Sequence, residues 1–321
     1  MKKKVLVCGI TGFMGRNIAE RFLSYPEDYD IYGVETFSKS CPLRGLTKLY
    51  SVDLTTKKGV DHVFAEQYDI VIQAAAVTSG SKDITERPYI HVTDNALMNS
   101  LILRACYETS VKHFIFLSCG VMYQPGENPR TEEDFNEHDT LHKSYFGVGW
   151  TKVYIEKMCE FYSSLGRTKH IAIRHSNTFG HHDKYDLEHS HVFGATIRKV
   201  MDAKDGDSIT VWGSGEDTAR DLIYVDNVVD FILKAINLQL KPFELVNVSY
   251  GKAITVKEMV ETIIELSGKK LSIIYDNSKP TIPTKLALSN SYALKVFGWA
   301  PKISFQEGIK RTLNWYKENY K

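Results

Sequence analysis

Three glycines near the start of the chain stand where a phosphate could bind. The segment "GITGFMG" places Gly9, Gly12 and Gly15 directly after an apolar run and directly before a helical pattern. Glycine lets the backbone turn tightly and approach a pyrophosphate, while the N–H groups of the following helix attract the negative charge. We therefore predict a dinucleotide site made by these glycines and the residues between them, Thr11, Phe13 and Met14.

A carboxylate indicates which dinucleotide would bind. Glu35 follows Gly15 by twenty residues, at the end of the second apolar run. There it can accept hydrogen bonds from an adenosine ribose, and it would repel the 2′-phosphate of NADP. NAD is the expected cofactor. NADP remains the alternative, because Arg16 and Lys39 are close enough in sequence to offset that repulsion.

Short apolar runs alternate with helical patterns through the first half of the chain. The runs "KVLVCGI", "DIYGVET", "DIVIQAAA" and "HFIFLSC" are bounded by polar residues or glycine, as is typical of buried parallel strands. Helical patterns lie between them, including 16–24 and 95–109. This alternation predicts an α/β fold with a Rossmann-type, doubly wound parallel sheet. Residues that follow the third and fourth strands are expected to line the cofactor: Asp53, Leu54, Ala74, Ala75 and Ala76.

The second half mixes strand and helix patterns without a repeat or a low-complexity linker. We predict a dinucleotide-binding domain over 1–170, to which the chain returns around 210–240. Residues 171–321 are expected to form mainly a smaller, mixed α/β substrate-binding region.

Charge and cysteine content limit the class of partner. Lys and Arg total 40 against 39 Asp and Glu, so no net field favours nucleic acid or a membrane surface. The five cysteines are scattered without a C-x-x-C pair, which indicates a reducing compartment such as the cytoplasm. The first apolar run is too short to span a membrane.

These residues together resemble a known enzyme family. The order and spacing of the glycine trio, Asp53, the alanine-rich strand end, Asn95 and Lys152 resemble the extended short-chain dehydrogenase/reductases of the NAD-dependent epimerase/dehydratase type. The segments "NTFGHHDKYDLEHSHVFGATIRK" and "ITVWGSGEDTARDLIYVDN" are similar to the substrate-binding segments of GDP-L-fucose synthases. The resemblance implies that Asn95 and Lys152 contact the cofactor and that the substrate is a GDP-linked sugar. It also implies that the subunits form a homodimer or a higher homo-oligomer.

The resemblance also implies where catalysis occurs. The family uses a tyrosine four residues before a lysine on one helix, together with a serine or threonine at a neighbouring strand end. The charge of the lysine lowers the pKa of the tyrosine phenol, so that the phenol can exchange a proton with a sugar hydroxyl. The lysine corresponds to Lys152, but the tyrosine position is Val148, which cannot transfer a proton. The serine position is Cys119, with Ser118 beside it.

Several groups remain open as the proton carrier. Tyr145 lies on the same helical face as Lys152, about 10 Å away along the axis. Lys152 itself or a histidine such as His142 could act through water, and an unrecognised base is a further option. Alternatively, the site is silent and the protein only binds a nucleotide sugar.

Epimerisation requires a second proton-transfer pair. His191 matches the histidine of that pair in GDP-L-fucose synthases, whereas Val121 stands at the cysteine position. One half of an acid/base pair cannot invert a carbon centre efficiently. Because these residues are incomplete and the ribose contact of Glu35 suits NAD as an oxidant, we expect oxidation at C4 of a GDP-linked manno-type hexose or heptose. This resembles the GDP-heptose 4-dehydrogenases of capsule pathways. A 4-keto-sugar reductase or a fucose-synthase-like epimerase/reductase is the alternative.

The resemblance implies a set of substrate contacts. Arginine suits a forked contact with a diphosphate and lysine a point contact. The implied residues are Asn177, His191, Arg198, Lys199, Trp212, Arg220 and Lys285. The cluster of His181, His182, Asp183, His189 and His191 contains zinc-ligand types without helical i, i+4 histidines, so no metal is expected.

Overall fold

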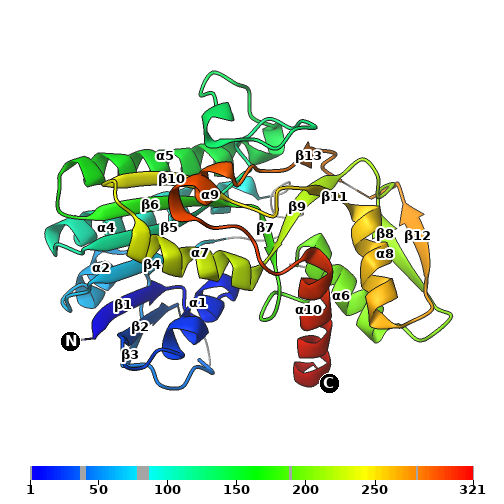
Figure 1. Cartoon of the computed structure of the whole chain (residues 1–321), viewed down its shortest axis with the longest axis horizontal. Helices are drawn as coiled ribbons and strands as arrows, with labels where there is room; N and C mark the ends of the chain where they lie inside the picture. The colour runs from blue at the N-terminus through cyan, green and yellow to red at the C-terminus, as the bar shows by residue number, and fades with distance from the viewer. Residues whose placement is uncertain (1, 37–40, 78–86, 188–189, 280, 321) are drawn as a thin grey trace.

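The computed structural model describes residues 2–36, 41–77, 87–187, 190–279 and 281–320. A parallel sheet lies at its centre and helices cover both faces (Figure 1). From one edge to the other its seven strands are β10 (Phe243–Val248), β6 (Lys169–His175), β5 (His113–Cys119), β4 (Ile70–Gln73), β1 (Lys3–Cys8), β2 (Tyr29–Glu35) and β3 (Lys48–Ser51). The predicted α/β fold with a doubly wound parallel sheet is confirmed.

Alternate residues of each strand pack on opposite faces of this sheet. Val5 and Val7 belong to the apolar cluster that includes α1 (Phe13–Leu23) and α7 (Val225–Leu238). Leu6, between them, belongs to the cluster with α4 (Thr93–Glu108) and α5 (Phe146–Ser164). Because strands buried on both faces need apolar residues at every position, the runs in the sequence are continuous. The helix α2 (Lys57–Val63) also packs on the α4 side.

A second group of elements lies beyond the carboxyl ends of the strands, at the right of Figure 1. Here β9 (Ala219–Tyr224) pairs with β7 (Asn177–Phe179), β11 (Ala253–Thr255) and β13 (Lys285–Leu286). A two-stranded sheet contains β8 (Ser208–Trp212) and β12 (Ser272–Asp276), and the helices are α6 (Val192–Asp202), α8 (Val256–Ser267) and α10 (Phe305–Asn319).

The chain crosses between the two regions more than once. β6 continues the central sheet to His175, and the chain returns to that sheet with α7, β10 and α9 (Ser291–Phe297). The expected division near residue 170 stays a prediction. Within the described ranges, no helix combines the length and apolar character needed to cross a bilayer.

A buried ion pair fixes α5 on the sheet. Arg174 of β6 is 2% exposed and donates to the Glu156 carboxylate of α5, with Nη2–Oε2 at 2.6 Å and Nε–Oε1 at 3.0 Å. Ser118 of β5 donates to the same carboxylate at 2.5 Å, and Arg174 Nη1 donates to the Tyr123 hydroxyl at 2.8 Å. Burial by itself would lower the pKa of Arg174, but the hydrogen bonds and charge of Glu156 raise it overall, so the guanidinium remains charged.

Removal of Arg174 should be costly. Arg174→Met would leave the Glu156 carboxylate buried without its cation, and the free energy of unfolding should fall by about 3–5 kcal/mol in denaturant titrations. Arg311→Met is the matched control, because Arg311 pairs with Glu307 on the surface and its loss should cost under ~1 kcal/mol. Equal, small losses in both variants would contradict this role of the buried pair.

Candidate active site

The glycine trio forms a tight loop between β1 and α1. Gly9 has φ +72°, and a Cβ there would lie 2.6 Å from Ala75 Cα, two residues after the end of β4. A Cβ on Gly15 would lie 2.1 Å from Gly9 O, so the first turn of α1 packs directly on the loop. Gly12 precedes α1 without a side-chain cap, and the first turn contains no acid. The helix N-terminus is therefore open to an anion.

This loop lies where the order of the strands reverses. The chain moves from β1 to β2 and β3 on one side, then places β4 on the other side of β1. In open α/β sheets the crevice at such a switch point is the usual ligand site. Thr11, Phe13 and Met14 are only partly buried at this point. The fold thus places the predicted phosphate loop at the position that suits a dinucleotide.

The neighbouring expected cofactor residues differ in their surroundings. Glu35 is 5% exposed at the carboxyl end of β2, beside β1. The Asp53 carboxylate accepts hydrogen bonds from Thr55 N at 2.8 Å and Thr55 Oγ1 at 2.7 Å, while Leu54 packs in the core. Asp53 therefore organises the turn before α2. Their expected contacts with the adenosine stay predictions.

Asn95 positions the backbone after β4. Its Oδ1 accepts from Val77 N at 3.0 Å, and its Nδ2 donates to Val77 O at 3.0 Å and to His91 O at 2.9 Å. Ala74 and Ala75, just before, are half-buried, and Ala76 is exposed. Asn95 holds this segment by two hydrogen bonds to the backbone of one residue, Val77, and its expected contact with the cofactor stays a prediction.

One of the two possible NADP contacts already has a partner. Arg16 Nε donates to Glu20 Oε1 at 3.0 Å, so this cation already has a partner. Lys39 lies outside the described residues.

Lys152 reaches the carboxyl edge of the central sheet from α5. Its Nζ donates to Leu117 O at 2.8 Å and lies 4.7 Å from the centroid of the Phe116 ring. Desolvation lowers the pKa of Lys152, while Cys119 and Glu156 oppose that shift. Burial raises the pKa of the Cys119 thiol despite nearby Lys152, so sulfur remains protonated at neutral pH. Cys119 and Lys152 are thus neighbours, and their catalytic roles stay predictions.

The other candidate proton carriers are less well placed. Ser118 is 1% exposed and donates to Glu156 beneath α5, so its hydroxyl is occupied in the ion-pair network. Tyr145 ends the 3₁₀ turn η3 (Lys143–Tyr145) before α5 begins, with its ring centroid 5.8 Å from that of His142. Val148 is half-buried, one helical turn before Lys152. A catalytic role for Tyr145 or His142 stays a prediction.

The sequence analysis missed His175, which lies at this same edge. In the parallel pairing of β5 and β6, His175 is opposite Cys119. The sequence feature that could have indicated it is a histidine at the carboxyl end of an apolar run, directly before Ser176 and Asn177. The buried pair of Arg174 and Glu156 was missed as well, because only the pairing of strand and helix brings these residues together.

Two of the expected substrate cations donate to backbone carbonyl oxygens of their own chain. Lys199 Nζ donates to Thr210 O at 2.7 Å, near Trp212, which is 45% exposed at the end of β8. Arg220 donates to the carbonyl oxygens of Ile282, at 3.1 Å, and Thr284.

Lys285 is exposed on β13, in register with Ala219, and is therefore beside Arg220. Arg198 pairs with Asp202 on its own helix. Asn177 and His191 are exposed, at the start of β7 and just before α6. These substrate roles stay predictions.

One cluster in the described ranges has the geometry of a possible metal site. Ligand atoms of Glu20, His181 and His182 lie within 4.8 Å of one another. However, His182 Nε2 is 2.9 Å from Glu20 Oε2, and Arg16 occupies the other carboxylate oxygen. A metal ion would have to displace this bond beside a guanidinium. His189 lies outside the described residues, and the expectation of no metal stays a prediction.

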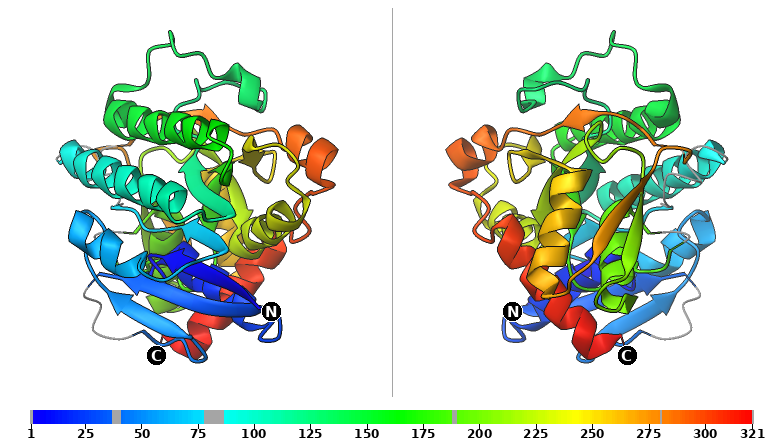
Figure 2. Two further views of the ribbon diagram at one scale, coloured as in Figure 1. Left: turned by 90° about the vertical axis from the view of Figure 1, so that its left-hand side faces the viewer. Right: turned by 90° about the vertical axis from the view of Figure 1, so that its right-hand side faces the viewer.

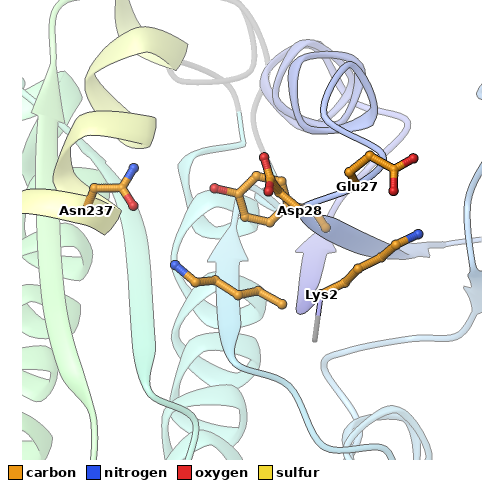
Figure 3. Close-up of a pocket in the computed structure, with 6 residues that line it drawn as sticks. Lys2, Glu27, Asp28 and Asn237 are labelled. Carbon is orange, nitrogen blue, oxygen red and sulfur yellow. The ribbon is translucent and has the colours of Figure 1, made fainter.

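A solvent-open hollow of about 640 Å³ lies at the amino ends of the central strands, at the other end from the glycine loop (Figure 3). It is lined by Lys2, Lys3, Glu27, Asp28, Tyr29 and Asn237, at the amino ends of β1 and β2. Parallel strands direct their carboxyl ends, and the glycine loop, to the other edge. The hollow is therefore separate from the candidate active site.

The fold and the glycine loop define a dinucleotide-binding α/β protein, and comparison with known proteins identifies its family. The model of the NAD dependent epimerase/dehydratase family matches residues 5–249, and the chain belongs to this family of enzymes. It is 30% identical over 271 residues to "Putative GDP-L-fucose synthase 2" of Arabidopsis thaliana, covering 84% of this chain and 82% of that protein.

Two further comparisons extend over almost the whole chain. GDP-L-colitose synthase of Yersinia pseudotuberculosis is 26% identical, and the aligned region covers 98% of this chain and 97% of that protein. The crystal structure of UDP-glucose 4-epimerase from Thermotoga maritima superposes with a TM-score of 0.85 at 23% identity, over 99% of this chain and 100% of that one. At this identity, the structural likeness establishes the fold alone.

Alanine substitutions in the glycine loop should have different effects at Gly15 and Gly12, because, of the two, only Gly15 lacks space for a Cβ. Gly15→Ala should abolish NADH binding, measured by nicotinamide fluorescence, because its Cβ would lie 2.1 Å from Gly9 O. Gly12→Ala is the matched control: the nearest atom lies at 3.3 Å, and binding should weaken only about tenfold or less. Equal affinities in Gly15→Ala and the wild type would exclude this loop as the phosphate site.

Proposed function

We propose that the protein is an NAD-dependent oxidoreductase of GDP-linked sugars. The proposal rests on two groups that lie at the carboxyl ends of the central strands. One is the open N-terminus of α1 behind the glycine loop, and the other is Lys152 beside Cys119. The first can hold a pyrophosphate and the second can stabilise negative charge near a reacting hydroxyl. The names of the relatives supply the sugar nucleotide class.

The direction of hydride transfer follows from the relatives more than from the residues. GDP-L-fucose synthases and GDP-L-colitose synthase favour reduction of a 4-keto sugar over our expected oxidation at C4. We therefore propose reduction of a GDP-linked 4-keto sugar. Val121 at the expected cysteine position is the reason to omit epimerisation from the proposal.

Oxidation at C4 remains the second candidate, and Glu35 favours it. Its position at the end of β2 suits the unphosphorylated ribose of NAD, the usual oxidant. A silent sugar-nucleotide binder would bind the same ligands without changing the oxidation state of the nicotinamide.

Turnover would be measured as the absorbance of reduced nicotinamide. With NADH and a GDP-linked 4-keto-6-deoxymannose the absorbance should fall, and with NAD and GDP-mannose-type sugars it should rise if oxidation is the direction. Lys152→Ala should reduce kcat at least ~10²-fold without loss of fold. Lys157→Ala is the control, since Lys157 is exposed on the same helix and pairs with Glu160.

Three outcomes of this assay distinguish the candidates. A fall with NADH supports reduction, and a rise with NAD supports the second candidate. Binding of both ligands without any change would leave the silent binder as the better description.

We also propose a homodimer formed through α4 and α5. These helices lie side by side on the outer face of the sheet (Figure 2), and Ser100 Oγ of α4 is 3.3 Å from the Tyr154 hydroxyl of α5. Large apolar side chains remain exposed along them, at Leu97 (48%), Tyr154 (48%) and Phe161 (58%). An apolar surface of this kind suits a second copy of the same chain.

Charge on this surface should prevent pairing. Leu97→Glu with Phe161→Glu should shift the protein from dimer to monomer in sedimentation or light scattering, because two like charges would be buried opposite their copies. Leu294→Glu, equally exposed on α9 at 55%, should leave the dimer intact. A wild-type monomer, or a dimer unaffected by both charges, would rule out this interface.

A further inference from the structure

His175 occupies a position from which it can act on a ligand at the sheet edge. It ends β6, between Cys119 of β5 and Val248 of β10 in the parallel register. The charge of Lys152 reaches it across this edge, and Lys152 in turn interacts with Cys119. His175, Cys119 and Lys152 thus form one group, drawn from two strands and α5.

The hydrogen bonds of His175 define its tautomer. Nδ1 lies 2.9 Å from Ser176 O, and a carbonyl oxygen only accepts, so Nδ1 carries the proton. Thr178 Oγ1, 3.0 Å from Nδ1, also donates to Ser176 O at 3.1 Å and supports the same orientation. Nε2 therefore presents a lone pair, because the hydrogen bonds of this ring to the described residues all involve Nδ1.

The surroundings keep the ring neutral. Burial lowers the pKa of His175 to about 4; the bond to Ser176 opposes this shift and the charge of Lys152 adds to it. Among the described residues, Lys152 acts on the ring through its charge, and Cys119 is the titratable group opposite it on β5. At pH 7 the imidazole is thus available as a proton acceptor, and an imidazolium would lose its proton readily.

The alternatives at this edge are weaker proton carriers. Val148 has no exchangeable proton, Ser118 donates to Glu156, and Cys119 remains a thiol of raised pKa. Tyr145 precedes the first turn of α5. His175 combines a fixed orientation with an unpartnered nitrogen.

We propose that His175 Nε2 is the catalytic group that exchanges a proton with the reacting hydroxyl of the sugar, in place of the phenol absent at Val148. This rests on the proposed function. In oxidation Nε2 accepts the hydroxyl proton as the carbonyl bond forms, and a bound NAD would supply the acceptor for the hydride that leaves the same carbon. In reduction each transfer reverses, and the proton on Nε2 first comes from solvent.

The proposal has a definite pH signature. The protonated fraction of a group with a pKa of about 4 falls tenfold for each pH unit above that value. The kcat for reduction should therefore fall about tenfold per unit between pH 6 and 8, while kcat for oxidation stays constant there.

Substitution tests the role directly. His175→Gln should lower kcat at least ~10²-fold and abolish this pH dependence, while NADH affinity by fluorescence stays within about threefold. His138→Gln, an exposed histidine of the 136–141 loop, should behave as the wild type. Addition of Val148→Tyr to His175→Gln should recover part of kcat, because it restores a phenol one turn before Lys152.

A readout independent of turnover completes the experiment. In ¹³C-histidine-labelled protein, the ring signal that His175→Gln removes should shift when NAD is added. Wild-type kcat and pH dependence in His175→Gln, or a ring signal unmoved by bound NAD, would each overturn the proposal. If the wild type binds NAD but oxidises or reduces no sugar, the proposed function fails, and the ring signal still decides whether His175 faces the cofactor.

Should His175→Gln not fold, Thr178→Val provides the second variant. It removes one partner of Nδ1 and leaves Nε2 in place. It should lower kcat several-fold with an unchanged KM, whereas an unchanged kcat would count against an oriented imidazole.

Discussion

The buried pair of Arg174 and Glu156 is the interaction on which the candidate active site depends. It joins the carboxyl end of β6 to the middle of α5, and Ser118 attaches β5 to the same carboxylate. Separation would leave a charge without solvent or partner, so the helix has little freedom to slide or rotate. Lys152 lies one turn before Glu156 and is therefore held where its ammonium reaches Leu117 O. The positions of Lys152 and Val148 relative to the sheet edge are a consequence of this pair.

Parallel strands then collect the remaining groups. Cys119, His175 and the glycine loop belong to different strands, but each follows the last buried residues of its strand. Since parallel strands end at one edge, residues far apart in the chain meet there. The reversal of strand order between β1 and β4 opens the crevice at this edge, and Gly9 can approach Ala75 there because it has no side chain.

Family and chemistry are separate conclusions in this protein. The family is established by the match over residues 5–249, and the fold follows from it. The reaction depends on a few side chains, and the resemblance to the family would place valines, Val148 and Val121, at two proton-transfer positions. The likeness to GDP-sugar synthases supports the substrate class, whereas the groups around Lys152 decide how a proton can move. Two of the expected substrate cations, Arg220 and Lys199, already donate to backbone carbonyl oxygens of this chain.

The sequence by itself determined the parallel α/β fold and the glycine loop, because both are local requirements. A strand buried on both faces needs a continuous apolar run, and a left-handed φ or a close approach needs glycine, as at Gly9 and Gly15. The tertiary structure decided which polar groups meet. Arg174 and Glu156, and His175 and Cys119, are far apart in sequence, and strand register with helix packing brings them together. It also showed that two residues expected at the site from their spacing form hydrogen bonds within the protein: Ser118 with Glu156, and Asn95 with Val77. No local sequence pattern reveals these partners.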